Sequence, residues 1–150
     1  MSVLPRGLPA PVPAADGLDR RYWEGTRNHE LRVQRCASCS AWRWGPEWVC
    51  HACGSFDTQW VAVEAAGRIF SWERVWHPVH PALGAAAPYV VLLVELPHAG
   101  GVRMVGNLAG DARAAVRIGD RVRAVFEDHD DDPPYTLVQW KLARHEEETK

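Results

Sequence analysis

The sequence predicts a mainly β protein in which a short N-terminal helix and a small cysteine-bearing ribbon precede a five-stranded barrel. Three observations lead to this prediction. Two Cys-x-x-Cys pairs lie ten residues apart in the first third of the chain. After residue 65, short runs of alternating apolar and polar residues are separated by turn-forming residues, which is typical of antiparallel strands. These runs follow the order of three strands, a short helical turn and two more strands.

Composition excludes several classes of protein. The 150 residues carry a formal net charge of −2, which argues against a dedicated nucleic-acid binder with a basic face. The longest apolar run, residues 89–96, is far shorter than the roughly 18 residues that a membrane-spanning helix needs. Residues 1–15 lack the basic start and apolar core of a signal peptide. We therefore expect a cytoplasmic protein with neither a membrane nor a nucleic acid as its partner.

The chain is expected to begin with an extended arm followed by a helix. Residues 1–15 contain four prolines among small apolar residues, a composition that favours an extended segment without a core of its own. Asp16 and Asp19 are suitable capping residues for a short helix that runs to about Arg27. Gly25 is expected to weaken or end this helix, because glycine is a poor helix former. The helix and the cysteine ribbon together form a predicted segment over residues 16–64.

The cysteine pairs lie between three predicted strands. Residues 31–35 lead into the first pair, residues 42–46 form a strand and turn between the pairs, and residues 58–63 follow the second pair. Alternating strands and Cys-x-x-Cys knuckles are the order of a rubredoxin-like zinc ribbon. A unit this short buries too little apolar surface to fold unaided, so it needs the metal.

Cys36, Cys39, Cys50 and Cys53 are all the cysteines of the chain. A two-residue spacing lets both sulfurs of a knuckle point at one metal, and two knuckles can close a tetrahedron around zinc. Disulfides would need an oxidising compartment, and redox Cys-x-x-Cys motifs seldom come as two matched pairs. We therefore predict a structural zinc ion that contributes on the order of 10 kcal/mol to folding. Four sulfurs leave no open coordination position, so the metal shapes the chain rather than catalysing a reaction.

Residues 65–143 are expected to form the barrel, and residues 144–150 a frayed tail. The five predicted strands cover residues 67–76, 89–96, 102–108, 118–126 and 135–142. The second strand is apolar on both faces and is therefore expected to be central. A short helical turn at 111–115 precedes the fourth strand, and an acidic loop at 127–134 follows it. This order is that of an OB-fold, a small and partly open barrel.

Eight tryptophans are too many for a small domain to bury easily, and exposed tryptophan is characteristic of interface anchors. On the first barrel strand, strict alternation places Phe70, Trp72, Arg74 and Trp76 on one face. Together with Trp23 on the helix, these residues are the candidate surface for a ligand or a protein partner. The alternative is that some of them belong to the barrel core.

A self-contained active site is hard to assemble from the remaining residues. No nucleophile elbow, phosphate loop or dinucleotide fingerprint is present, and no cysteine is left over as a nucleophile. His77 and His80 lie near Glu73 and could be imagined as an acid–base pair, but their proline-rich loop is more typical of a turn or contact surface. We therefore expect no catalytic residue in this chain.

Basic residues around the fourth strand allow two interpretations: Arg113, Arg117, Arg121 and Arg123. They could hold the phosphates of a nucleotide-like ligand, because guanidinium groups bind phosphate in a bidentate manner. The less specific interpretation is a solvated face in which they pair with Asp111 and Asp120.

An OB-fold behind a zinc ribbon also fits a single-stranded nucleic-acid module. Trp72 and Trp76 with Arg74 and Arg103 could line a stacking groove. The acidic run over residues 128–132 weighs against this alternative, because it falls in the loop that commonly helps OB-folds grip a nucleic-acid strand.

In the order of its short motifs, the chain resembles an acyl-CoA-associated OB-fold family with an N-terminal rubredoxin-like zinc ribbon, long catalogued as a domain of unknown function. The resemblance spans about residues 16–142. It is carried by Tyr22-Trp23-Glu24, Glu30-Leu31, Arg35-Cys36-x-x-Cys39, Cys50-x-x-Cys53-Gly54, Gly67-Arg-Ile-Phe-Ser71, Pro88-Tyr89 and Gly119-Asp-Arg-Val122.

The resemblance implies a non-catalytic subunit of a larger acyl-CoA-processing complex. Members of the family look like accessory subunits that accompany thiolase-fold enzymes or hydratases. Their ribbon and helix dock on the partner, and the OB-fold helps to hold or channel the CoA thioester. On this chain the resemblance makes the candidate surface for acyl-CoA or the partner the one formed by Trp23, Phe70, Trp72, Arg74 and Trp76. In actinobacterial sterol catabolism, similar domains support a thiolase-like aldolase (a lyase) that cleaves a steroid side chain by retro-aldol chemistry. Such an aldolase is therefore the first expected partner, in a possible two-plus-two assembly. A hydratase is the second and a biosynthetic thiolase the third.

Overall fold

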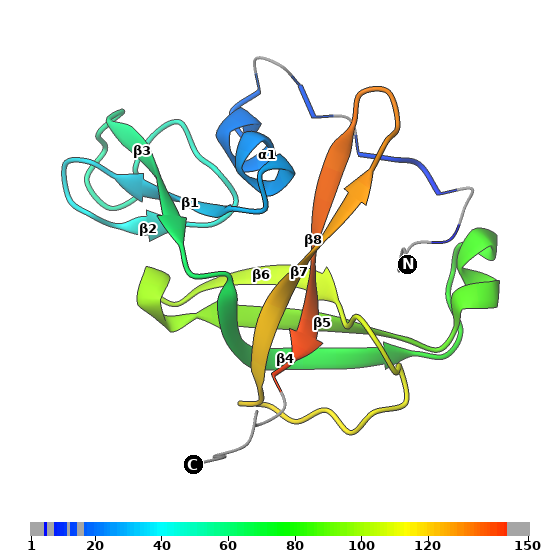
Figure 1. The fold of residues 1–150 in the computed structure, drawn as a ribbon. Helices are drawn as coiled ribbons and strands as arrows, with labels where there is room; N and C mark the ends of the chain where they lie inside the picture. Colours follow the sequence, from blue (N-terminus) through cyan, green and yellow to red (C-terminus); the bar gives the residue numbers. More distant parts are fainter. Residues whose placement is uncertain (1–4, 6–7, 12, 15–16, 144–150) are drawn as a thin grey trace, which may run out of the picture.

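The computed structural model describes residues 5, 8–11, 13–14 and 17–143, and it confirms a mainly β fold with one short N-terminal α-helix (Figure 1). The predicted tail over 144–150 lies outside the described residues, as does much of the predicted arm over 1–15. The elements, in chain order, are α1 (Arg20–Arg27), β1 (Leu31–Cys36), β2 (Trp42–Arg43), β3 (Thr58–Val63), β4 (Ala66–Val75), the 3-10 helix η1 (Pro81–Ala86), β5 (Tyr89–Leu96), the 3-10 turn η2 (Pro97–Ala99), β6 (Val102–Asn107), β7 (Arg121–His129) and β8 (Tyr135–Leu142).

Helix α1 packs against β1 of the ribbon and against β8 of the barrel, and so joins the two sheets (Figure 1). It ends at Arg27, as predicted, but Gly25 does not interrupt it. Gly25 is buried where β1 passes close to the helix, and a Cβ atom there would lie 2.8 Å from the carbonyl oxygen of Glu30. Gly25 therefore does not end the helix, and its missing side chain is what allows the helix and the start of β1 to approach.

The ribbon is a three-stranded antiparallel sheet in the order β2-β1-β3. Strand β1 is its centre, with Gln34 opposite Arg43 on β2 and Cys36 opposite Thr58 on β3. Strand β2 contains only Trp42 and Arg43, so it is shorter than the predicted 42–46 segment, whose second half is a turn.

The barrel is a five-stranded antiparallel sheet in the order β6-β5-β4-β7-β8. A parallel bridge between Leu108 and Trp140 links the end of β6 to β8, so the sheet is nearly closed. Alternate residues of β5 point inward and are buried, among them Leu92 and Val94, and the indole of Trp140 is fully buried with them. Strand β5 lies between β4 and β6, as its apolar sequence predicts.

Two predicted connections differ from the structure. Residues 111–115 form a single turn closed by a hydrogen bond from the Ala114 amide to the Asp111 carbonyl oxygen, 3.0 Å, instead of a helical element. Strand β7 continues to His129, which pairs with Tyr135, so the predicted acidic loop over 127–134 is reduced to residues 130–134. The acidic residues at the end of β7 thus belong to a long hairpin that extends beside α1 (Figure 1).

None of the helices among the described residues has the length and apolar character needed to cross a membrane. The division of the chain into segments over 16–64 and 65–143 stays a prediction.

Candidate zinc centre and interaction surface

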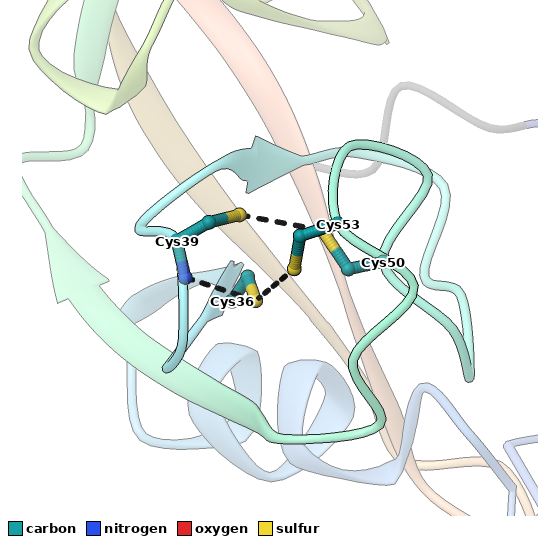
Figure 2. A group of neighbouring side chains, drawn as sticks. All are labelled: Cys36, Cys39, Cys50 and Cys53. Carbon is teal, nitrogen blue, oxygen red and sulfur yellow. Dashed lines mark hydrogen bonds between the residues drawn. The ribbon is translucent and has the colours of Figure 1, made fainter.

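The four cysteine sulfurs converge on one point between the two knuckles (Figure 2). All four Sγ atoms lie within 4.8 Å of one another. The Sγ atoms of Cys36 and Cys53 are 3.7 Å apart, and those of Cys39 and Cys50 are 3.6 Å apart. A disulfide would require about 2.05 Å, whereas four sulfurs at 2.3 Å from a central zinc lie about 3.8 Å from one another. The donor set therefore fits a tetrahedral zinc ion.

Local backbone turns produce this convergence. In the first knuckle the Ser40 amide donates to the carbonyl oxygen of Cys36 at 3.0 Å, and in the second the Gly54 amide donates to that of Cys50 at 2.8 Å. Ser40 and Gly54 both adopt a positive φ, which tightens the chain after each cysteine pair. The Cys39 amide donates to the Cys36 sulfur at 3.4 Å, and this hydrogen bond is the largest of several causes that together lower the pKa of Cys36 to about 6. The turn thereby favours the thiolate form that binds metal.

The coordination sphere is complete with these four side chains. Cys36 and Cys50 are buried, and Cys39 and Cys53 lie at the surface. Within the described part of the chain, no other group of three or more histidine, cysteine or acidic side chains is placed to hold a metal. Four thiolates fill a tetrahedron, so this is a structural zinc site of the rubredoxin-like type with no position for substrate.

A residue that the sequence did not single out supports this centre. Gln34 is fully buried, and its side-chain amide forms two hydrogen bonds with the backbone of Glu47, in the segment that leads to the second knuckle. Alternation along β1 places Gln34 on the face opposite Leu31 and Val33, so the strand pattern gave no signal that this polar side chain is buried. Such a residue is retained inside a protein only when its hydrogen bonds are satisfied.

The predicted aromatic surface on β4 is exposed, but it does not lie on a single face. Phe70, Trp72 and Trp76 are 39%, 36% and 51% exposed. A β-bulge shifts the register between Ile69 and Ser71, so the strict alternation assumed from the sequence is wrong at Phe70. Phe70 lies against Arg103, on the outer face of the sheet, whereas Trp72 is opposite the inward-facing Leu92.

Each exposed ring on β4, and that of Trp76 just after it, has a guanidinium group above it. The Cζ atom of Arg103 lies 3.4 Å from the Phe70 ring centroid, that of Arg74 lies 5.5 Å from Trp72, and that of Arg113 lies 5.4 Å from Trp76. These distances are in the range of cation–π contacts, which hold both partners in place.

Arg74 also fixes the turn that follows β6. Its Nε and Nη2 groups donate to the carbonyl oxygens of Ala112 at 2.8 Å and Ala114 at 2.7 Å. Arg113 lies between these two acceptors in the chain and covers Trp76, so the turn packs against Arg74 and Trp76. Arg74 is therefore a positioning residue for this turn, with two of its donors already used by the backbone.

Trp23 lies elsewhere. It is on α1, half-buried, with its indole Nε1 donating to Asp19 Oδ2 at 2.8 Å and its ring 5.2 Å from that of Tyr22. The structure thus separates Trp23 and Phe70 from the Trp72–Arg74–Trp76 patch. The imagined acid–base pair is also not formed: His80 accepts a hydrogen bond from the Ala82 amide at the start of η1, and no bond links Glu73 to a histidine among the described residues.

Comparison with known proteins gives matches along most of the chain. Residues 23–59 match the family described as "ChsH2, rubredoxin-like zinc ribbon domain", and residues 60–127 match "ChsH2, C-terminal OB-fold domain". A solved structure named "Ltp2-ChsH2(DUF35) aldolase" superposes with a TM-score of 0.75 and 36% identity, covering 89% of this chain and 100% of that chain. A Sulfolobus solfataricus DUF35 protein of unknown function, at 14% identity and a TM-score of 0.59 over 85% of this chain and 86% of its own, shares the fold.

Two curated relatives are similar at the sequence level. A "Probable enoyl-CoA hydratase alpha subunit" of Thermomonospora curvata is 40% identical over 141 residues, 93% of this chain and 42% of the relative. The "3-oxo-4,17-pregnadiene-20-carboxyl-CoA hydratase alpha subunit" of Mycobacterium tuberculosis is 35% identical over 150 residues, 91% of this chain and 45% of the relative. The chain thus spans less than half the length of these two relatives. With its four-cysteine ribbon, its nearly closed barrel and its match to a whole ChsH2 chain, this protein belongs to the ChsH2 (DUF35) family.

Proposed function

We propose that this chain is a non-catalytic accessory subunit that docks on an enzyme of acyl-CoA metabolism. The observation that carries the proposal is its similarity to the full length of the ChsH2 chain in a structure named as an aldolase. The residues agree with such a role. The metal site has no open position, and the described residues form no acid–base pair around Glu73. Any base for carbon–carbon cleavage would then belong to the partner.

The preferred partner is a thiolase-fold retro-aldolase that cleaves the side chain of a steroid-type CoA thioester. The solved structure named "Ltp2-ChsH2(DUF35) aldolase" supports an aldolase as the partner. The name of the M. tuberculosis relative, a pregnadiene-carboxyl-CoA hydratase subunit, supports a steroid-type substrate. A hydratase is the alternative partner, because both curated relatives are named as hydratase subunits. A biosynthetic thiolase is the third candidate.

Two exposed aromatic sets supply surfaces for these roles. On the ribbon, Trp48 is 67% and Phe56 is 75% exposed, and large exposed rings are characteristic anchors of protein interfaces. We assign this set to docking on the partner. On the barrel, Trp72 and Trp76 lie beside the turn held by Arg74, and we assign this second patch to the acyl-CoA entrance.

The test is copurification followed by reconstitution. A tagged chain is recovered from its native cell, associated proteins are identified by mass spectrometry, and the mass of the complex is measured by light scattering. We expect a thiolase-like protein in stoichiometric amount, in a two-plus-two assembly, whose retro-aldol activity falls when this chain is left out. Full activity of the partner alone would refute the accessory role, and a copurified hydratase would select the alternative partner.

The alternative function is that of a module that binds single-stranded nucleic acid, because OB-folds with exposed rings and arginines can bind it. Fluorescence anisotropy with a labelled oligonucleotide at two salt concentrations separates the two. Tight binding that weakens steeply with salt would favour the nucleic-acid module.

A further inference from the structure

Four basic residues lie side by side on the outer face of three neighbouring barrel strands. On β7, Arg121 and Arg123 are two residues apart and both exposed, while Val122 between them is buried. Arg68 on β4 is opposite Arg121, and Lys141 on β8 is opposite Arg123. Residues opposite each other on adjacent strands share a face. With strands about 4.8 Å apart and alternate residues about 6.8 Å apart, the four Cα atoms span roughly 12 Å.

This arrangement is electrostatically unfavourable in the isolated chain. Like charges directly opposite each other destabilise a sheet, and here two such pairs are adjacent. Arg68 is compensated by Glu95, whose carboxylate lies 2.7 Å from its Nη2 and has a lowered pKa chiefly because of this hydrogen bond. By contrast, Arg121, Arg123 and Lys141 take part in no ion pair, ring contact or side-chain hydrogen bond with any described residue.

Three acidic residues, Glu64, Asp111 and Asp120, lie nearby, and none of them forms an ion pair with these cations among the described residues. Asp111 accepts a hydrogen bond from the Arg113 amide at 2.8 Å, and Asp120 accepts one from the Arg117 amide at 2.9 Å. Both carboxylates thus stabilise turns of the loop between β6 and β7. The expectation that the arginines pair with Asp111 and Asp120 is therefore wrong among the described residues.

The four cations line a broad groove of about 1300 Å³ at the end of the barrel where β4 and β7 begin and β8 ends. Small residues such as Ala66, Gly67, Gly110 and Ala143 form much of its remaining wall and leave room for a ligand. No phenylalanine, tyrosine or tryptophan lines it, and the imidazole of His98, which does, lies 2.9 Å from the Glu64 carbonyl oxygen. Binding of single-stranded nucleic acid depends on aromatic platforms, so this groove fits phosphate groups without stacked bases.

We propose that the face formed by Arg68, Arg121, Arg123 and Lys141 binds the phosphate groups of the CoA moiety. This inference rests on the proposed acyl-CoA function and adds the part of the ligand that the chain recognises. The diphosphate and the ribose 3′-phosphate of CoA place several negative charges over a length comparable with the four cations. Guanidinium groups match phosphate oxygens in a bidentate manner, which favours phosphate recognition over a lone carboxylate.

The test compares CoA with analogues that lack phosphates. CoA, 3′-dephospho-CoA and pantetheine are titrated calorimetrically into the zinc-loaded full chain, alone and in complex with its copurified partner. The variants are Arg121→Ala/Arg123→Ala and the milder Lys141→Gln, which keeps the test usable if the double variant does not fold. Arg117→Ala is the matched control, because Arg117 is exposed but does not line the groove.

We expect affinity to decrease from CoA to dephospho-CoA to pantetheine. The double variant should weaken CoA binding about tenfold, with a shallower dependence on salt, and leave pantetheine binding unchanged. Lys141→Gln should act in the same direction by a smaller factor, and Arg117→Ala should have no effect. Zinc content should match the wild type, and the melting temperature of the double variant should be at least as high, because it loses like charges that lie opposite each other.

Equal affinity of the wild type for CoA and pantetheine, or unchanged CoA affinity in both variants, would overturn the proposal. So would a single-stranded oligonucleotide that binds this face more tightly than CoA. A further variant changes Glu146, Glu147 and Glu148 to Gln. If CoA binds only to this variant, the basic face binds the chain's own acidic C-terminal residues instead of CoA, and the proposal is overturned.

The test is separable from that of the proposed function. If the complex forms and needs this chain for activity but the variants bind CoA normally, the phosphate assignment alone fails. If the chain binds CoA through these residues but recovers no enzyme, the accessory role alone fails.

Discussion

Gln34 and Glu47 exchange two hydrogen bonds across the ribbon. The Gln34 side-chain amide donates to the Glu47 carbonyl oxygen and its side-chain oxygen accepts from the Glu47 amide, each at 3.0 Å. Gln34 is two residues before Cys36, and Glu47 is three residues before Cys50. The pair therefore fixes the segments that enter the two knuckles relative to each other.

Replacing Gln34 should loosen the zinc site without removing a ligand. Gln34→Leu removes both hydrogen bonds to the Glu47 backbone, so we expect the free energy of unfolding to fall by about 2 kcal/mol. Zinc transfer to a chromophoric chelator should become faster, which a stopped-flow measurement detects. Gln59→Leu on the exposed side of β3 is the control and should change neither quantity. Equal behaviour of the two variants would contradict this role of Gln34.

Removal of one thiolate should unfold the ribbon. In Cys39→Ser the tetrahedron loses a sulfur, and with it much of the roughly 10 kcal/mol that zinc contributes to a unit with so little core. We expect elemental analysis to show one zinc per wild-type chain and far less in the variant, with hydrogen exchange rising over β1 to β3. Ala37→Ser, which adds a hydroxyl inside the same knuckle, should keep its zinc. Full metal content in Cys39→Ser would argue against four-sulfur coordination.

Acid should weaken the contact between His29, which follows α1, and Asp128 in the hairpin of β7 and β8. Thr136 donates to Asp128 at 2.7 Å and His29 lies 2.9 Å from the same carboxylate, and both lower the pKa of Asp128, Thr136 most. Because the pKa of Asp128 is lower in the folded protein, its carboxylate stabilises the fold at a pH above the unfolded pKa of about 3.9. This stabilisation is lost as the pH falls through the lower pKa of the folded state.

Thermal melting between pH 2.5 and 7 checks this linkage. Asp128→Asn should melt below the wild type near neutral pH, and the difference should shrink as the pH falls below about 4. Asp130→Asn, a neighbouring exposed substitution, should follow the wild type throughout. A difference between Asp128→Asn and the wild type that does not change with pH would exclude this carboxylate as the source.

The sequence predicted the succession of strands along the chain and the zinc ligands because both depend on local signals. Cysteine spacing, turn residues and apolar runs are each visible within a few positions. The bulge beside Phe70 was not predictable in this way, because alternation assumes an uninterrupted pleat and the shift depends on the pairing of β4 with β5. The acidic end of β7 was interpreted as a loop because its charges are typical of one. Asp128 is in fact held in a strand by Thr136 and His29, from two other parts of the chain.

The basic face formed by the four cations could not be predicted from the sequence either. Arg121 and Arg123 are close along the chain, but Arg68 and Lys141 join them only through the registers of β4 and β8. Arg113, which the sequence grouped with them, instead covers Trp76.

Docking on the partner should depend on the exposed ring of Trp48. Truncating a central aromatic anchor commonly costs more than 1 kcal/mol of binding, so Trp48→Ala should weaken the complex about tenfold. Val105→Ala is a suitable control, because Val105 is 66% exposed, almost as much as Trp48, but lies on the outer face of β6. Surface plasmon resonance with the immobilised partner would measure both. An equal effect of the two substitutions would argue against docking through the ribbon.

Gly106 should tolerate no side chain, because β6 passes directly over a buried indole. A Cβ atom at Gly106 would lie 2.7 Å from Cδ1 of Trp140 and 2.8 Å from the Val138 carbonyl oxygen. Neither can move easily, since Trp140 is fully buried and Val138 belongs to β8. Gly106→Ala should therefore cost about 1–3 kcal/mol of stability, as overpacking of a core does. In Gly84→Ala the new methyl group meets nothing within 4 Å, so chemical denaturation should show little change. If Gly106→Ala were as stable as Gly84→Ala, β6 would not pack against β8 as described. The barrel would then not be nearly closed.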